Sequence, residues 1–518
     1  PRSPGLRSKP LRSRAPARYS TGMRVGEALS LCRLAGNGHR VPRGFILSTE
    51  LFRTRQAMTF KPFYQDTLLR IRRAIHELEN QLDLQLGNPD SLLMLSIRSG
   101  AAISMPGQMS TFINVGLNPT LVEEFGQRTG HQWMAWDSYR RYLQSWAMSE
   151  GVVREEFDTI MSESKDRFGV DKKHELAPEQ MREIALDYKL RAEELGVIFD
   201  EDPFEQIVQC VFKVLDSWEA PQARDFRRYT GMAEDWGTAV VVQHMVHGNL
   251  SHDSGAGVTF TRNPQQPQSR KIRLFGDFAI RSQGEDLVGG LVFPLPISEA
   301  QRQQIPAYQG VENSLERNFP EIFAKLNEVA SQLVSEHNHD DLEIEFTFVS
   351  PRGEDLFLLQ KRPMITEFVD EIPQRNGSTA KDDRLLGLGL GVAGGFFQGR
   401  VAIDLEQIEQ LIADSPEEPI ILLRPDTVPE DLSMIVRAGG LLTARGGSTS
   451  HAAVTAKRLG KVAVVDCRTL QVIENEGIGL LGDAKLSMGD WISIDGRTGH
   501  IYRGCLLPTN KTGKTETP

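Results

Sequence analysis

Residues 445–460 read RGGSTSHAAVTAKRLG, and this run constrains the local fold more tightly than any other part of the sequence. The paired glycines permit a tight turn, and Thr449 or Ser450 can cap the backbone amides of a helix that begins beside them. Alanines follow at helix-favouring positions, and Gly460 is a typical stop signal. We therefore expect His451 in the first turn of a helix, where the positive end of the helix dipole disfavours the imidazolium form.

Two interpretations of His451 are open on these residues alone. A histidine beside a helix cap is usually an ordinary first-turn residue, because caps are common and catalytic histidines are rare. The alternative is a phosphate-accepting nucleophile, since a neutral imidazole attacks phosphorus and the amides at a helix N-terminus bind phosphoryl groups. The choice between them depends on the rest of the chain.

The composition indicates a multidomain globular protein. The chain has 518 residues, 40% of them hydrophobic, which predicts two to four domains. Its formal net charge of -10 argues against a general nucleic-acid binder. No apolar run approaches the ~20 residues needed to span a bilayer, so we expect no membrane insertion. The cysteines form no Cys-x-x-Cys pair, which fits a reducing compartment and gives no zinc signature; they are Cys32, Cys210, Cys467 and Cys505.

The first residues leave two expectations for the compartment. Residues 1–18 are rich in Arg, Ser and Pro and contain no acidic residue, which predicts a disordered tail and also resembles an organelle transit peptide. We expect a cytoplasmic protein, with an organelle as the alternative.

Hydrophobic periodicity divides the rest of the chain into segments of different character. Helices are predicted at 22–36, 68–84, 136–146, 178–195 and 320–336. Strands are predicted at 41–47, 91–98, 238–243, 257–262, 342–348 and 355–362, with a closing hairpin at 491–502. Helical patterns dominate 119–218, and the polar stretch 366–384 is predicted to link two domains.

Several charged side chains are suited to a phosphate and metal site, which needs positive charge, glycine-rich backbone and carboxylates. Arg98 ends a predicted strand and precedes a loop of small residues, and Arg24 lies in a glycine-containing stretch. Glu343 and Glu345 share one strand face by the two-residue period, and Arg362 ends the next strand. Taken alone, the carboxylate pair is more often a solvated strand face.

Seven runs match one family in order: SIRSGAAISMPGQM (96–109), DSYRR (137–141), DWGTAV (235–240), VQHMVHGN (242–249), DSGAGVTFTRNP (253–264), QGED (283–286) and the His451 run. The last resembles the phosphohistidine motif Gly-Gly-x-Thr-Ser-His-Ala-Ala of the phosphoenolpyruvate-utilising enzymes. Over roughly 22–504 the chain resembles the pyruvate, phosphate dikinase family. The helical segment before residue 235 favours that family over phosphoenolpyruvate synthase and the drug phosphotransferases, which are similar around the histidine.

The resemblance implies an α/β (α+β) multidomain fold. An ATP-grasp nucleotide-binding domain with a helical insert is expected to precede a swivelling α/β phosphohistidine domain. The expected segments are a disordered basic tail (1–21), the amino-terminal ATP-grasp lobe (22–118), the helical insert (119–230), the carboxyl-terminal lobe (231–368), a linker (369–385), the phosphohistidine domain (386–505) and a tail (506–518).

The resemblance also implies a reaction. ATP would be split to AMP as a pyrophosphoryl group passes to His451, inorganic phosphate would take the terminal phosphoryl group and release pyrophosphate, and the remaining phosphoryl group would pass to pyruvate. The expected cofactor is Mg²⁺. The family continues into a barrel domain that binds pyruvate or phosphoenolpyruvate, and this chain ends about where that domain should begin.

The destination of the phosphoryl group is therefore open. The barrel is expected in the missing part of a longer protein or in a separate partner chain. A stand-alone dikinase acting on another small molecule and a weakly active nucleotide-binding phosphocarrier are the alternatives, and a homodimer is one expectation for the assembly.

Carried over residue by residue, the resemblance assigns catalysis to His451, Arg98 and Arg362 and Mg²⁺ binding to Glu343 and Glu345. ATP contacts are expected from Arg24, Arg98, Gln243, Met245, Glu285, Gln360 and Arg362. Weaker candidates for the inorganic-phosphate site are Arg140 and Arg141, and Thr449 is a candidate regulatory phosphorylation site.

Two positions depart from the family pattern. The family's Gly-Gly-Lys is Gly-Met-Arg here, ending at Arg24, and its Asp-x-Glu metal pair is Glu343-Ile-Glu345. Arginine presents a planar fork where lysine presents a compact ammonium group, and glutamate places its carboxylate one methylene further out than aspartate.

Overall fold

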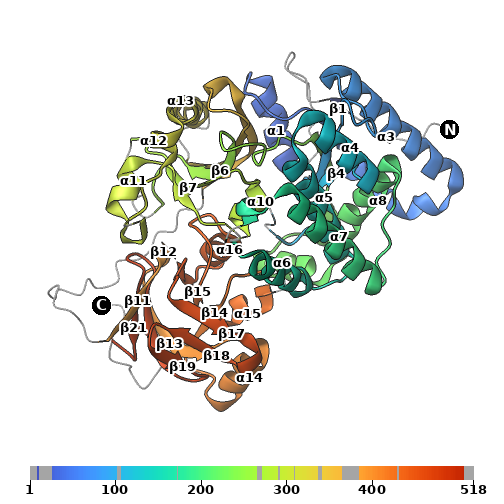
Figure 1. Ribbon diagram of the computed structural model, residues 1–518. Helices are drawn as coiled ribbons and strands as arrows, with labels where there is room; N and C mark the ends of the chain where they lie inside the picture. Colours follow the sequence, from blue (N-terminus) through green and yellow to red (C-terminus); the bar gives the residue numbers. More distant parts are fainter. Residues whose placement is uncertain are drawn as a thin grey trace. The chain divides into compact units, whose positions relative to one another are not determined.

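The computed structural model describes residues 9–10, 26–101, 105, 107–171, 173–264, 271–289, 292–308, 310–336, 341–364, 384–428 and 431–506. The chain divides into two compact units (Figure 1). The first contains Pro1–Leu250 and Phe357–Gln360, and the second contains Ser251–Leu356 and Lys361–Pro518. Arg24 and residues 1–8, 11–21, 369–383 and 507–518 of the predicted tails and linker lie outside the described residues.

A five-stranded antiparallel sheet organises the first unit, in the order β1-β2-β5-β3-β4. Its strands are β1 (Lys9–Pro10), β2 (Gly44–Leu47), β5 (Val240–His244), β3 (Leu95–Ser99) and β4 (Thr111–Val115). β5 follows the helical segment in sequence but lies between β2 and β3, so the sheet combines chain from both sides of that segment. Lys9–Pro10, within the predicted basic tail, pairs with β2, and the expectation of a disordered tail stays a prediction.

Helices surround this sheet, and the predicted helical segment is confirmed. They are α1 (Gly26–Gly36), α2 (Thr49–Arg53), α3 (Lys61–Leu82), α4 (Pro119–Thr129), α5 (Gln132–Ser149), α6 (Arg154–Phe168), α7 (Pro178–Glu194), α8 (Pro203–Asp216) and α9 (Pro221–Thr230). Proline at the first helical position begins four of them, because its missing amide would have no partner there. The central helix α5 is buried along most of its length and packs against α4, α7 and β4.

The second unit begins with another five-stranded sheet, in the order β10-β9-β6-β7-β8 (Figure 1). Its strands are β10 (Leu356–Pro363), β9 (Leu342–Phe348), β6 (Gly255–Phe260), β7 (Phe275–Ile280) and β8 (Leu295–Pro296). The helices are α10 (Gly284–Val288), α11 (Glu299–Gln304), α12 (Leu315–Asn318) and α13 (Pro320–Glu336). The predicted bounds of α13 and β9 are confirmed to the residue, because Pro320 opens the helix and β9 is an uninterrupted run of alternating strand residues.

An eight-stranded sheet follows, in the order β11-β21-β20-β13-β14-β15-β16-β12. Its strands are β11 (Leu385–Leu388), β12 (Leu390–Ala393), β13 (Phe396–Ala402), β14 (Ile420–Arg424), β15 (Gly440–Thr443), β16 (Val462–Val465), β20 (Trp491–Asp495) and β21 (His500–Arg503). The last two form the predicted hairpin. A small sheet is built from β17 (Leu470–Ile473), β18 (Ile478–Leu481) and β19 (Ala484–Leu486).

The centre of the eight-stranded sheet is parallel and places the histidine. Strands β13, β14, β15 and β16 run parallel, and the helices α14 (Leu405–Asp414), α15 (Leu432–Arg437) and α16 (His451–Arg458) connect them in turn. In parallel sheets, the loops that follow the carboxyl ends of neighbouring strands meet at one edge and commonly form binding sites. The loop after β14 and the start of α16, which follows β15, therefore lie side by side.

Within the described residues, no helix combines the length and the apolar character that a membrane crossing requires.

Candidate functional site

His451 is the first residue of α16, as the sequence predicts. The preceding residue, Ser450, is the N-cap, and its hydroxyl accepts from the amide of Ala453 at 3.4 Å. The turn before it depends on glycine, because Gly446 has a φ of 109°. The helix ends at Arg458, and Gly460 follows in the left-handed region at φ 63°.

The imidazole of His451 is buried, with 6% of the residue exposed, and a threonine hydroxyl lies beside each of its nitrogens. Oγ1 of Thr427, in the loop after β14, lies 3.0 Å from Nδ1. Oγ1 of Thr455, one turn along α16, lies 3.3 Å from Nε2. The neighbouring carboxyl ends of β14 and β15 bring these groups together.

The site keeps this imidazole neutral. Burial lowers the pKa of His451 to about 4, against smaller opposing effects of Asp426 and of the backbone of Thr427. The sequence also predicted a neutral ring, but from the helix dipole, whereas burial is the main cause of the lowered pKa in the structure. A threonine hydroxyl can donate or accept, so each ring nitrogen has a partner in either neutral tautomer.

A buried carboxylate on β7 holds the loop before His451. Oδ2 of Asp277 accepts from the hydroxyl of Ser448 at 2.7 Å and from the amide and hydroxyl of Thr449 at 3.2 and 3.3 Å. Its other oxygen, Oδ1, accepts from the hydroxyl of Tyr308 at 2.7 Å. A Cβ added to Gly447 would lie 2.5 Å from Oδ2, so the loop can approach the carboxylate only with glycine at this position.

Sequence reasoning missed Asp277. Burial raises its pKa, and the hydrogen bonds from Ser448, Tyr308 and Thr449 oppose that rise by stabilising the carboxylate. The available signal was a single acidic residue in the middle of FGDFAI, a strand that is otherwise apolar, because a buried charge in a strand needs dedicated partners. Thr449, the candidate phosphorylation site, is itself buried in this contact.

In the first unit, the structure brings several predicted nucleotide contacts together. Arg98 on β3 donates through Nη2 to Oε1 of Gln243 at 3.1 Å and to the carbonyl of Leu359 at 2.7 Å. The side-chain amide of Gln243, on β5, donates to the carbonyl of Pro42 at 2.9 Å. The backbone amide of Met245 donates to the carbonyl of Met94 at 2.8 Å. Backbone groups therefore hold these segments together, and Arg98 supplies the positive charge.

In the second unit, the predicted metal carboxylates share one arginine. Arg362, on β10, pairs with Glu343 and lies 3.2 Å from Glu345, so both carboxylates face the same way on β9, as predicted. Mg²⁺ is commonly held by one or two carboxylates together with substrate phosphates. No group of three or more His, Cys, Asp or Glu is placed to hold a metal in the described part of the chain. The pair therefore fits Mg²⁺ bound to a nucleotide better than a metal cage made by protein alone.

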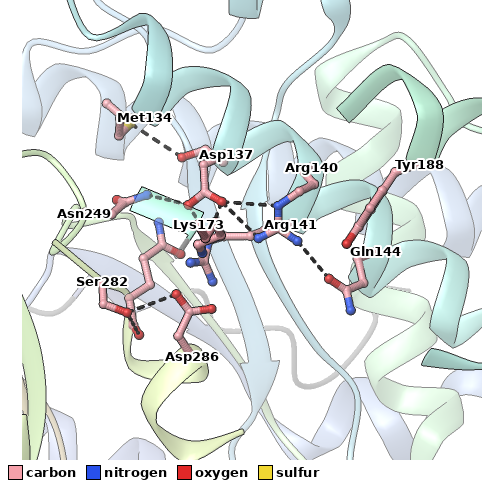
Figure 2. Close-up of polar contacts among 12 residues, drawn as sticks. Met134, Asp137, Arg140, Arg141, Gln144, Lys173, Tyr188, Asn249, Ser282 and Asp286 are labelled. Atoms are coloured by element: carbon pink, nitrogen blue, oxygen red, sulfur yellow. Dashed lines mark hydrogen bonds and ion pairs between the residues drawn. The ribbon is translucent and has the colours of Figure 1, made fainter. Parts of the chain in front are cut away.

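Figure 2 shows the surroundings of Arg140 and Arg141, the weaker phosphate candidates. Both pair with Asp137, at 2.9 Å each, and Lys173 lies 3.4 Å from the same carboxylate. Asn249 also donates to it, at 3.1 Å. Burial acts to raise the pKa of Asp137, but the charges of Arg141, Lys173 and Arg140 outweigh burial and hold it well below its usual range. Three cations thus meet one carboxylate inside the unit.

The remaining predicted ATP contacts are Glu285, Gln360 and Arg24. Glu285 is exposed on the short helix α10, whereas the next residue, Asp286, is buried and accepts from Ser282 at 3.0 Å (Figure 2). Gln360 is buried at the end of the segment that groups with the first unit. Arg24 belongs to the residues that the structure does not describe.

Comparison with known proteins gives two family matches. A model described as pyruvate phosphate dikinase, AMP/ATP-binding domain, matches residues 47–380, and one described as PEP-utilising enzyme, mobile domain, matches residues 416–499. Three relatives are pyruvate, phosphate dikinases. The Clostridium symbiosum protein is 33% identical over 92% of this chain and 56% of its own length. Chloroplastic dikinase 1 of Arabidopsis thaliana is 32% identical over 92% of this chain and 50% of its own length. The Rhizobium meliloti protein is 33% identical over 84% of this chain and 51% of its own length. The chain spans about half the length of these relatives.

The burial of His451 leads to a prediction about its titration. Nitrogen-15 NMR of the histidine-labelled chain should show a neutral ring at pH 6, because burial lowers the pKa to about 4. In urea the same ring should titrate near its ordinary pKa of about 6.5. Between these pKa values the unfolded chain binds more protons, so acidification through this window should lower the free energy of unfolding. A ring half protonated near pH 6.5 in the folded chain would contradict this description.

The Asp277 contact leads to a second prediction. Asp277→Asn replaces one carboxylate oxygen by an NH₂ group, which faces donors on Ser448 and Thr449 or on Tyr308 and cannot accept from them. The loop before His451 should therefore open more often. We expect amide hydrogen exchange of Thr449 to accelerate by about tenfold or more, since charge-assisted hydrogen bonds contribute roughly 1.5–3 kcal/mol. Asp253→Asn, at an exposed acidic residue, is the control. Unchanged exchange at Thr449 in Asp277→Asn would show that this carboxylate does not hold the loop.

Proposed function

Because this chain belongs to the pyruvate, phosphate dikinase family, we propose that it catalyses the ATP- and phosphate-dependent part of the dikinase reaction and forms a phosphohistidine on His451. The observation that carries the proposal is the neutral imidazole of His451 at the start of α16, inside the match to the mobile domain. In this proposal, residues 22–368 form an ATP-grasp domain with the helical insert 119–230, and residues 386–505 form the domain that swivels.

The proposed reaction has two steps on this chain. The lone pair of Nε2 forms a bond to the β-phosphorus of ATP, and the bond from that phosphorus to the oxygen bridging the α-phosphorus breaks. AMP leaves with this oxygen and its electron pair. An oxygen of inorganic phosphate then attacks the γ-phosphorus, and pyrophosphate leaves while the bridging oxygen stays on the β-phosphorus. The β-phosphorus therefore remains on His451.

Arginines and carboxylates already described would bind the nucleotide. We propose that Arg98 and Arg362 bind phosphates, since a guanidinium fork matches phosphate oxygens in two places. Gln243, Met245, Gln360, Arg24 and Glu285 are proposed as further ATP contacts. When bound by Glu343 and Glu345, Mg²⁺ would neutralise charge on the phosphates. For this to happen, Arg362 has to exchange its carboxylate partners for phosphate oxygens.

Inorganic phosphate is proposed to bind near Arg140 and Arg141. The support is the concentration of positive charge, because Arg140, Arg141 and Lys173 surround a single carboxylate, Asp137. An anion is stabilised where cations outnumber carboxylates in a buried setting.

The final acceptor is also a matter of proposal. We propose pyruvate, converted to phosphoenolpyruvate by a barrel domain in a longer protein or in a separate chain, because the relatives named above are about twice as long as the matched region. A cytoplasmic location is proposed, with an organelle as the alternative, since one relative is named chloroplastic. The other candidates for this chain are a stand-alone dikinase with another small-molecule acceptor and a weakly active phosphocarrier. Discharge of labelled protein by a small molecule without a barrel partner would favour the first, and nucleotide binding without AMP production would favour the second.

Labelling with ATP tests the proposal. The chain, incubated with Mg²⁺, phosphate and ATP labelled at the β-phosphorus, should acquire acid-labile label, because that phosphorus stays on His451. With label at the γ-phosphorus, label should appear without phosphate and leave as pyrophosphate once phosphate is added. His451→Ala should acquire neither label.

Two outcomes would contradict the proposal: no β-label on the wild-type chain, or β-label that survives His451→Ala. For the phosphate site, Arg141→Ala should retain γ-label after phosphate is added, whereas the exposed control Arg228→Ala should release it like the wild type.

A further inference from the structure

The helix that begins at His451 carries a second polar side chain directed at the imidazole. Thr455 lies one turn later on α16, is 3% exposed, and places Oγ1 3.3 Å from Nε2. Residues four apart lie on the same side of a helix, which explains the contact. Nε2 is the nitrogen that keeps its lone pair when Nδ1 carries the proton, so the hydroxyl faces the nucleophilic atom.

The direction of this hydroxyl is unusual for a helical threonine. Such hydroxyls ordinarily donate to the carbonyl four residues earlier. This chain contains several examples, with distances between 2.7 and 3.0 Å: Thr67, Thr129, Thr159 and Thr230. Thr455 instead makes its side-chain hydrogen bond with the side chain four residues earlier. The rotamer is therefore set by the imidazole and not by the helix backbone.

The tautomer assigns the donor. The hydroxyls of Thr427 and Thr455 contact Nδ1 and Nε2, and each can donate or accept. In the tautomer with the proton on Nδ1, Thr427 accepts from Nδ1 and Nε2 accepts from the hydroxyl of Thr455. This hydrogen bond stabilises the neutral ring and holds the lone pair in a fixed direction until ATP arrives.

We propose that Thr455 is a positioning residue for His451, donating to Nε2 in the free protein and to a phosphoryl oxygen after transfer. The inference rests on the proposed function. When the bond from Nε2 to phosphorus forms, the lone pair is consumed and AMP departs with the bridging oxygen, while Nδ1 and Thr455 both keep their protons. The freed hydroxyl turns to the nearest acceptor, an oxygen of the phosphoryl group. Because hydrogen bonds to charged acceptors are stronger than those to neutral ones, the exchange favours the phosphorylated form.

Two substitutions separate the hydroxyl from the space it fills. Thr455→Val keeps the branched shape and removes the donor, and Thr455→Ser keeps the donor. With β-labelled ATP, Mg²⁺ and phosphate, Thr455→Val should lower the ratio of phosphorylated to free protein by roughly fivefold, the difference expected between charged and neutral hydrogen bonds. Thr455→Ser should stay within about twofold of the wild type.

Nitrogen-15 NMR of the unphosphorylated protein tests the contact independently of activity. In Thr455→Val the resonance of Nε2 should move downfield and the pKa of His451 should rise, because the neutral ring loses a donor; Thr455→Ser should restore both. An unchanged Nε2 resonance in a folded Thr455→Val chain would overturn the inference, and so would equal labelling of Thr455→Val and the wild type. Absence of label on the wild-type chain would instead overturn the proposed function, while the NMR comparison would still decide whether Thr455 binds Nε2.

Discussion

The buried imidazole of His451 needs a partner for each nitrogen, and the rest of the site depends on meeting that need. An unsatisfied polar atom in a protein interior lowers the free energy of unfolding, and a buried imidazolium without a partner lowers it further. The parallel arrangement of β14 and β15 supplies one partner from the loop that carries Thr427. The helical repeat of α16 supplies the other from Thr455. The outcome is a buried neutral ring with a partner at each nitrogen, and the neutral ring is the form in which histidine acts as a nucleophile.

The same loop is held from outside its own sheet. Asp277, on a strand of the neighbouring five-stranded sheet, accepts three hydrogen bonds from Ser448 and Thr449, and Tyr308 supports the carboxylate from its other side. If residues 386–505 travel between two sites, as proposed, these contacts have to break at each departure. Their number and their burial then set a barrier to departure, and Gly447 is required for the loop to return to the carboxylate.

The sequence predicted the local features of this site and missed the long-range ones. Caps, glycines and helix periodicity placed His451 at a helix start, and the two-residue strand period placed Glu343 and Glu345 on one face, because both rules act over a few neighbouring residues. The contact of Asp277 with the loop joins residues 171 and 172 positions apart, and no local pattern encodes such a pairing. Thr455 was visible at the right helical spacing, but its hydroxyl has two acceptors within reach, and only the tertiary structure decides between them.

The proposed reaction depends on Nε2 of His451 being the atom that accepts the phosphoryl group. The most direct measurement is NMR of the nitrogen-15-labelled, phosphorylated chain, in which the nitrogen bonded to phosphorus shows a one-bond coupling. We expect this coupling at Nε2, with the proton retained at Nδ1 beside Thr427. A coupling at Nδ1, or phosphorus attached to another residue, would contradict it.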